Sequence, residues 1–249
     1  MNIALQPKAL QPSAPADLDL SDEMAALWVA LGPVPPERAR VVQFVAAASG
    51  EGASTIAREF AFLAARRAKK AVWLVDLDLF GASQQKAIAA RPQRYGPMGK
   101  AAAASPDGSS FFAVQPPQLG PEGRPRSPGS YFSARPLLGG KLWVTRFHSE
   151  AVAPEQSVAI SRELRYWAAL RAHADYIIID APAADRSTAA LTLAPVADVN
   201  VLVVAAEAGD ARGPAALRGS LEAAGGKVAG LVFNRAQLRP PPFLQKLIR

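Results

Sequence analysis

The stretch VAAASGEGAST, residues 45–55, decides the fold. It follows an apolar run at 41–46 that one glutamine interrupts, and it opens a segment with helical periodicity at about 54–67. Gly50 and Gly52 allow the backbone to wrap closely around a bound group. Backbone N–H groups and the helix N-terminus then supply positive potential. The sequence therefore predicts an anion-binding loop between a buried strand and a helix.

Six consecutive positions of this loop are the predicted contacts to the phosphates of a nucleotide. They are Gly50, Glu51, Gly52, Ala53, Ser54 and Thr55. The hydroxyl of Ser54 occupies the place at which such loops ligate Mg²⁺. The loop is thus predicted to combine a phosphate site with a metal-binding hydroxyl.

Outward from this loop, apolar runs alternate with amphipathic segments along the chain. Strands are predicted at about 41–46, 72–75, 142–146, 176–179, 199–205 and 228–233. Helices are predicted at about 21–31, 54–67, 84–90, 154–174, 187–193 and 214–224. Strands that alternate with helices imply a mostly parallel central sheet covered by helices on both faces. The expected fold class is α/β, in one domain over 21–235.

Three segments differ in composition from this domain. Residues 1–20 are rich in proline and alanine, and we expect a flexible N-terminal segment there. Residues 91–140 are basic and rich in proline and glycine, so an insertion formed mostly of loop is expected. Residues 236–249 form a basic C-terminal tail.

Composition and charge exclude several classes of protein. The 249 residues contain no cysteine and two histidines, which excludes disulfides and thiol nucleophiles and argues against a His-rich metal site. The longest apolar tract, 189–206, is interrupted by Pro195, Asp198 and Asn200, and the N-terminus does not have the pattern of a secretory signal, so a cytoplasmic protein is expected. The net charge is +7, with the basic excess between 83 and 150. Such a surface attracts phosphates, anionic lipid heads or acidic sugars, although an ordinary solvated surface has the same composition.

Five segments, in register along the chain, resemble the motifs of the bacterial tyrosine kinases (BY-kinases) of capsule and exopolysaccharide synthesis. The loop resembles their Gly-Glu-Gly-Lys-Ser-Thr sequence, LVDLD at 74–78 their second Walker motif, and DYIIIDAP at 175–182 their Walker B strand. ADV at 197–199 and VFNR at 232–235 look like the next two elements. Those kinases are similar to the ParA/MinD group of deviant-Walker ATPases. The resemblance covers about 21–235 except the insertion, and it implies the P-loop NTPase fold.

The resemblance also implies a ligand, ATP or ADP with Mg²⁺, and roles for individual residues. Asp76 and Asp78 would be catalytic carboxylates, with Asp76 close to the metal. Ser54 would ligate Mg²⁺, Asp180 would hold it through water, and Asn234 would read the adenine base. The residues alone leave simpler interpretations open. Carboxylates also lie in the polar rim at strand ends, and Asp and Asn also end strands and form turns.

The loop departs from this family at its most important charge. Ala53 stands where the P-loop lysine is expected, and Ala48 stands where the ParA/MinD group has its signature lysine. Losing one such preorganised group typically costs ~10²–10³ in rate. Arg58, one helical turn after Ser54, is a candidate to replace part of this charge, and the alternative is a solvated residue on the helix face.

Two further features of the BY-kinases are missing. Their acceptor tyrosines lie in a C-terminal cluster, whereas the tyrosines of this chain are Tyr95, Tyr131, Tyr166 and Tyr176. Their Glu-x-x-Arg-x-x-Arg assembly motif is represented here by Glu23, Ala26 and Val29, without its arginines. The combined losses predict a pseudokinase.

Three functions are consistent with these observations. The leading hypothesis is a catalytically impaired BY-kinase-like protein of exopolysaccharide or capsule biosynthesis, peripheral at the inner membrane, whose partner is a polysaccharide co-polymerase or chain-length protein. One alternative is a ParA/MinD-like switch ATPase that binds ATP and forms homo- or hetero-oligomers. The other is an interaction module that binds anionic lipid or polymer without nucleotide. Sequence-specific binding to nucleic acid is not expected.

Overall fold

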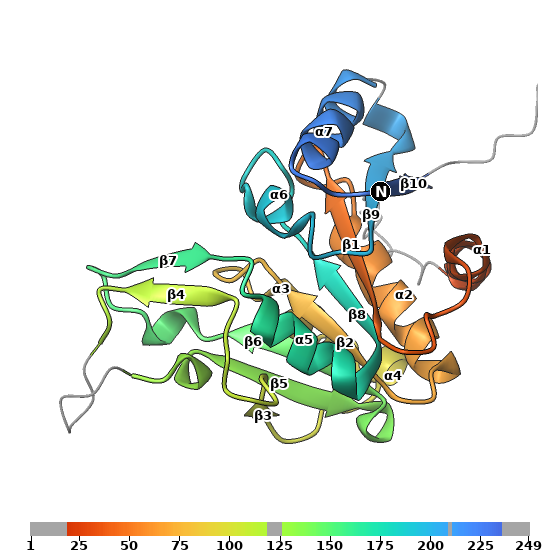
Figure 1. Cartoon of the computed structure of the whole chain (residues 1–249). Coiled ribbons are helices and arrows are strands. Elements are labelled where there is room, and N and C mark those ends of the chain that lie inside the picture. Colours follow the sequence, from red (N-terminus) through yellow and green to blue (C-terminus); the bar gives the residue numbers. More distant parts are fainter. Residues whose placement is uncertain (1–18, 119–125, 209–210, 236–249) are drawn as a thin grey trace, which may run out of the picture.

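A computed structural model describes residues 19–118, 126–208 and 211–235, and its centre is an eight-stranded sheet (Figure 1). The strand order is β10-β9-β1-β8-β2-β6-β5-β3. The strands are β1 (Arg40–Ala46), β2 (Ala71–Asp76), β3 (Ala102–Ala103), β5 (Phe132–Leu137), β6 (Leu142–Phe147), β8 (Ala174–Asp180), β9 (Val199–Ala205) and β10 (Val228–Asn234). The neighbours from β10 to β6 are parallel, and β5 and β3 are antiparallel additions at one edge. The predicted α/β class with a mostly parallel sheet is confirmed.

Helices cover both faces of this sheet and enclose one apolar core on each (Figure 1). One face carries α1 (Ser21–Leu31), α2 (Ala53–Arg67), α3 (Ser83–Ala89) and α4 (Pro92–Tyr95). The other carries α5 (Leu164–His173), α6 (Ala189–Leu193) and α7 (Arg212–Ala223). Short 3₁₀ helices lie at Pro128–Ser130, Leu138–Gly140, Ser149–Ala151 and Ala206–Ala208. Because the central strands are buried on both sides between two such layers, they are largely apolar, and the buried polar pair Gln43 and Asn200 is joined by a hydrogen bond.

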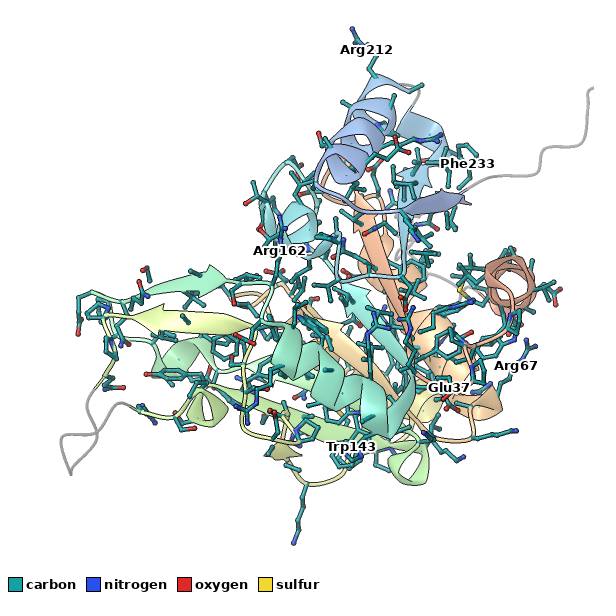
Figure 2. The ribbon with its side chains drawn as sticks, in the orientation of Figure 1. Glu37, Arg67, Trp143, Arg162, Arg212 and Phe233 are labelled. Carbon is teal, nitrogen blue, oxygen red and sulfur yellow. The ribbon has the colours of Figure 1, made fainter. Side chains whose placement is uncertain are left out.

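Helix α2 places the end of the loop against the sheet. Its alanines let the helix approach closely, and Phe60 fills the space beside Phe44 of β1, with the ring centroids 5.6 Å apart. Helix α1 is attached to this layer through Trp28, whose ring lies 4.8 Å from that of Tyr176 and 6.1 Å from that of Phe60. The guanidinium of Arg67, labelled in Figure 2, lies 5.6 Å from the centre of the Trp28 ring. The aromatic contacts therefore hold α1 and α2 together on one face.

The predicted long helix at 154–174 is wrong in its first half. Residues Ser157–Ile160 form β7, which pairs antiparallel with β4 (Phe112–Gln115), and α5 begins only at Leu164. The reason is local: residues 157–160 alternate in exposure, as a strand does, and the Glu163 side chain accepts the Arg165 N–H at the start of the helix. Strands β4 and β7 lie side by side at the left of Figure 1.

In the described part of the insertion at 91–140, loop segments are extensive, as expected, but they connect short regular elements that were not predicted. Helix α4 and strands β3, β4 and β5 lie within it, and its aromatic side chains complete one of the two cores. Phe111 packs against Phe132 with the ring centroids 5.4 Å apart, and Phe112 packs against Phe147 at 5.2 Å. These rings bury enough apolar area to offset the cost of ordering a proline-rich segment. Residues 119–125 of the insertion lie outside the described part of the chain, as do 1–18 of the N-terminal segment and the whole tail, 236–249.

No helix in the described part of the chain is both long enough and apolar enough to cross a membrane.

Candidate functional site

The predicted loop follows β1 and leads into α2 at the carboxyl edge of the sheet. Gly50 and Gly52 both have left-handed backbone, with φ of 88° and 95°. The amides of Ala53 and Ser54 lie in the first turn of α2 and therefore have no acceptor within the helix. The loop borders a pocket of about 430 Å³. We call it the loop pocket, and besides the loop it is lined by Asp78, Ser83, Asp180, Ala181, Pro182, Ala183, Arg186 and Arg235.

The end of β10 is attached to the loop by two consecutive side chains. Asn234 Nδ2 donates to the Glu51 carbonyl at 2.8 Å, and Arg235 Nη2 donates to the Gly50 carbonyl at 2.8 Å. A Cβ at Gly52 would lie 2.0 Å from Asn234 Nδ2, so only glycine leaves room for this contact. Asn234 is buried, and in this geometry its side-chain amide holds the loop. Its predicted role as reader of an adenine base remains a prediction.

Two loop amides are used by carboxylates of the protein itself. Glu51 is buried, and its Oε2 accepts the Ala48 N–H at 2.9 Å. Asp185, in the segment after β8, accepts the Ser49 N–H at 2.8 Å and the Ser49 hydroxyl at 2.9 Å. The backbone hydrogen bond from Ser49 lowers the pKa of Asp185, so this carboxylate is ionised at neutral pH. An anion approaching this part of the loop therefore meets negative charge.

Gln84 in the first turn of α3 connects three of the predicted site residues. Its Nε2 donates to Asp180 Oδ2 at 2.6 Å and to the Ser54 carbonyl at 2.8 Å, and its backbone N–H donates to Asp76 Oδ2 at 2.9 Å. The side chain is fully buried. The other oxygen of Asp76 accepts the Asp78 N–H at 3.0 Å. Asp76, Asp180 and Ser54 thus belong to one network behind the loop pocket.

The two carboxyls of this network have raised pKa values. Burial, and then the nearby Asp180 carboxylate, raises the pKa of Asp76 to about 8. Burial raises the pKa of Asp180 to about 6, against hydrogen bonds from Gln84 and Ser54 that favour the charged form. The pair of carboxyls therefore retains a proton to higher pH than two isolated aspartates would.

Asp78 lies farther out than Asp76 and lines the loop pocket. Its Oδ1 accepts the Gly81 N–H at 3.2 Å, and its Oδ2 lies 3.3 Å from Arg186 Nη2. The structure thus places both predicted carboxylates at the end of β2, next to Asp180 at the end of β8, with Asp78 lining the pocket and Asp76 buried beneath it.

A magnesium ion fits Ser54 and Asp180, two of the residues that the sequence singled out. Asp180 Oδ1 is buried and has no hydrogen-bond partner among the described residues, and the Ser54 side chain interacts with the same carboxyl group. Mg²⁺ prefers such oxygen donors, and it usually takes few protein ligands because water and phosphate complete its shell. In the part of the chain that the structure describes, no cluster of three acidic, histidine or cysteine side chains could hold a metal ion.

Arg58 does not replace the missing lysine. It is buried, and its guanidinium donates to Tyr95 Oη at 3.1 Å, to Gln84 Oε1 at 3.1 Å and to Thr55 Oγ1 at 3.4 Å. It does not line the loop pocket. The solvated alternative is wrong as well, because the side chain joins α2 to α3 and α4.

Sequence reasoning missed Gln84, Asp185 and Arg186. Gln84 was placed in a short helix with no role, because its three partners come from distant segments. Asp185 and Arg186 follow the predicted Walker B strand by five and six positions, and their polarity after an apolar run was a usable signal. Ala53, which stands at the position expected for the P-loop lysine, is buried.

Neither a protein-family model nor a curated protein sequence matches the chain. Among solved structures, the kinase domain of the Escherichia coli tyrosine kinase Etk is similar with a TM-score of 0.55 and 14% identity, over 88% of this chain and 78% of that one. The chimerical protein CapA2B2 is similar with a TM-score of 0.57 and 18% identity, over 91% and 87%. A putative plasmid partition protein from Borrelia burgdorferi B31, bound to AMPPNP, gives 0.51 and 15% over 84% and 80%. The similarity establishes the predicted P-loop NTPase fold.

Proposed function

We propose that this chain is a catalytically impaired BY-kinase-like protein that acts in exopolysaccharide or capsule biosynthesis or export as a regulator. One observation carries the proposal: the loop has the fold and the glycines of a phosphate-binding loop, but a buried alanine, Ala53, at the position of its lysine. That lysine places positive charge on the phosphate groups whose charge changes during transfer. Without it, the loop has only backbone N–H groups to stabilise that charge.

One carboxylate beside the loop supports impaired catalysis. Asp185 accepts an amide hydrogen that a bound polyphosphate would otherwise receive, and it adds negative charge near the position of the phosphates. Such a charge opposes binding and further charge development there. Phosphoryl transfer would therefore be slow even with nucleotide present.

The burial of the tyrosines supports the proposal that the chain does not phosphorylate itself. Tyr95, Tyr131, Tyr166 and Tyr176 are the tyrosines of the chain, and each is at most 4% exposed. Burial also raises the pKa of Tyr95, Tyr166 and Tyr176. An acceptor hydroxyl has to reach the active site of an enzyme molecule, and these hydroxyls are enclosed by side chains of their own domain. A tyrosine kinase that modifies itself would need a different acceptor.

The polysaccharide pathway and the partner rest on family resemblance. The motifs resemble those of BY-kinases, and the fold is similar to the kinase domain of Etk. We therefore propose an inner-membrane polysaccharide co-polymerase or chain-length protein as partner, with the chain peripheral at the membrane. Fold similarity alone does not carry a function, so this part depends on the experiment below.

Genetic complementation tests both parts of the proposal. In the organism that carries the gene, deletion is expected to lower the amount or chain length of exopolysaccharide. Wild type and Asp78→Ala are expected to restore it equally, because a regulator does not need the catalytic carboxylate. An unchanged polymer in the deletion strain would overturn the pathway. Restoration by wild type and failure by a stably expressed Asp78→Ala would overturn the loss of catalysis.

A nucleotide-controlled switch is the second candidate, and one observation favours it. Asp180 Oδ1 is a buried carboxylate oxygen without a partner among the described residues, beside the Ser54 hydroxyl, which suits a bound Mg²⁺-nucleotide. A switch would change its oligomeric state when nucleotide binds. Light scattering on the eluted protein, with and without millimolar Mg-ATP, separates the two candidates. A nucleotide-dependent dimer would support the switch, and an unchanged mass would count against it.

A further inference from the structure

The loop pocket is lined by positively charged side chains, although the loop itself contains none. Among the described residues that line it, the positively charged ones are Arg186 and Arg235. Arg186 belongs to the segment after β8, and Arg235 directly follows β10. They therefore come from two strands on either side of β1, whose end carries the loop.

We propose that Arg186 and Arg235 replace the missing loop lysine from outside the loop, so that the pocket binds the phosphates of a nucleoside di- or triphosphate between them. The inference rests on the proposed function, since it assigns a ligand to the same site. It concerns binding and not transfer of the phosphate. Two guanidinium groups at the rim neutralise a bound polyphosphate without the contact to the transferred group that a loop lysine makes.

Arg235 is already fixed at the loop. Its Nη2 donates to the Gly50 carbonyl at 2.8 Å, which leaves the other N–H groups of the guanidinium available. Its backbone is left-handed, with φ of 57°, which is uncommon for a residue other than glycine and turns the chain after Asn234. A planar fork of donors beside a phosphate-binding loop matches the oxygens of a phosphate group.

Arg186 lines the pocket from the segment after β8, and its side chain is weakly held. Its contact with Asp78 is 3.3 Å long, and 53% of the side chain is exposed. Exposed pairs of this kind contribute little free energy, so the guanidinium can turn toward a phosphate at low cost. Asp78 would then be free to face the ligand or its metal ion.

The buried carboxylate of Asp180 is an independent sign of a ligand. Its Oδ1 is enclosed and has no partner among the described residues, although an unpaired buried carboxylate oxygen is costly. Asp180 also lines the loop pocket. The uncompensated oxygen indicates that a cation belongs in this pocket, and Mg²⁺ carried by a nucleotide supplies one together with the anion that the two arginines require.

Calorimetry with Mg-ADP and Mg-ATP on the full chain tests the inference. We expect wild type to bind, and Arg186→Gln and Arg235→Gln each to weaken binding about tenfold, since each removes a charge-assisted hydrogen bond to phosphate. Arg162→Gln is the matched control. That exposed arginine, labelled in Figure 2, donates to the Thr192 carbonyl in α6 and does not line the loop pocket, so its loss should leave affinity unchanged.

Two further variants separate charge from loop structure. Arg235→Lys retains the charge and should bind more tightly than Arg235→Gln, whereas Ala53→Lys should restore affinity in the Arg186→Gln background. Arg186 makes no contact with the loop, so its variant tests the inference even if Arg235→Gln disturbs the fold. Absence of wild-type binding at millimolar nucleotide, or equal affinity of Arg186→Gln and wild type, would overturn the inference. Neither result touches the proposed function, which complementation tests.

Discussion

At the scale of single residues, the carboxyl pair Asp76 and Asp180 makes the stability of the fold depend on pH. An unfolded Asp ionises near pH 4, whereas burial keeps Asp76 protonated in the folded protein until about pH 8. Between these values the folded state holds a proton that the unfolded state has lost. The contribution to stability is therefore fully present below about pH 4 and is lost as the pH rises toward 8. Asp180 acts in the same direction over a narrower range, up to about pH 6.

Asp76→Asn should flatten this pH dependence. The variant cannot ionise, so its free energy of unfolding should fall less than that of wild type between pH 5 and 8. At pH 5 the variant should be less stable by about 1–3 kcal/mol, because an amide nitrogen replaces one of two oxygens that accept backbone N–H groups. The difference should shrink toward pH 8. Urea unfolding at several pH values measures it, with the exposed Asp22→Asn as control. Parallel curves for Asp76→Asn and wild type would contradict the assignment.

Gly52→Ala tests the contact between the loop and β10. A Cβ there would lie 2.0 Å from Asn234 Nδ2, and the φ of 95° is already unfavourable for alanine. We expect a loss of about 1–3 kcal/mol in the free energy of unfolding, measured in urea.

Gly219→Ala in α7 is the matched control for that substitution. It has open space around the added methyl group and no left-handed backbone, so it should be neutral or stabilise by up to about 1 kcal/mol. Equal effects of the two alanines would show that the close approach at Gly52 is unimportant.

At the scale of elements, Trp28 is one of the side chains that hold α1 to the domain, together with the buried Met24. Trp28 contacts the rings of Tyr176 and Phe60 and the guanidinium of Arg67. Trp28→Ala should release α1 and cost about 2–4 kcal/mol, somewhat less than for a fully buried tryptophan. Hydrogen exchange should become faster in 21–31 and remain slow in the central strands.

Val29→Ala, in the next position of the same helix, is the control. Val29 is 75% exposed, and its substitution should change stability by less than about 0.5 kcal/mol. Unchanged exchange in α1 of Trp28→Ala, or equal acceleration throughout the sheet, would refute the role of Trp28.

The elements also show which parts of the fold could be predicted. Buried parallel strands are continuous apolar runs, so β1, β8 and β9 were predicted within one or two residues. Strand β7 was not, because its partner β4 lies more than forty residues earlier, and a four-residue segment carries too little periodicity to reveal the pairing. The proline-rich insertion concealed β5 for a similar reason, since its structure depends on antiparallel pairing with β6.

The candidate site was predicted where its chemistry is carried by contiguous motifs. The loop, Asp78 and Asp180 do line one pocket, because the carboxyl ends of neighbouring parallel strands meet at the same edge. The connection through Gln84 and the contact of Asp185 with Ser49 could not be predicted, since both depend on how segments 30 to 136 positions apart approach each other.

At the scale of the whole molecule, the fold can be stable whether or not the site catalyses phosphoryl transfer. Two apolar cores, one on each face of the sheet, hold the site in place. Ala53, at the position of the loop lysine, contributes a methyl group to one of these cores, so the fold does not require a charged side chain there. Stability is therefore not evidence that the site turns over nucleotide.

The edge strand β10 exposes two large apolar side chains, Leu231 and Phe233, the latter labelled in Figure 2.

Phosphate release from saturating Mg-ATP by the purified full chain, with phosphotyrosine detected in the same samples, tests the central claim most directly. The account predicts a rate that does not differ from that of Asp78→Ala and no phosphotyrosine, because the loop lacks its lysine and the tyrosines are buried. A wild-type rate that Asp78→Ala abolishes, or phosphotyrosine on the wild-type chain, would contradict it.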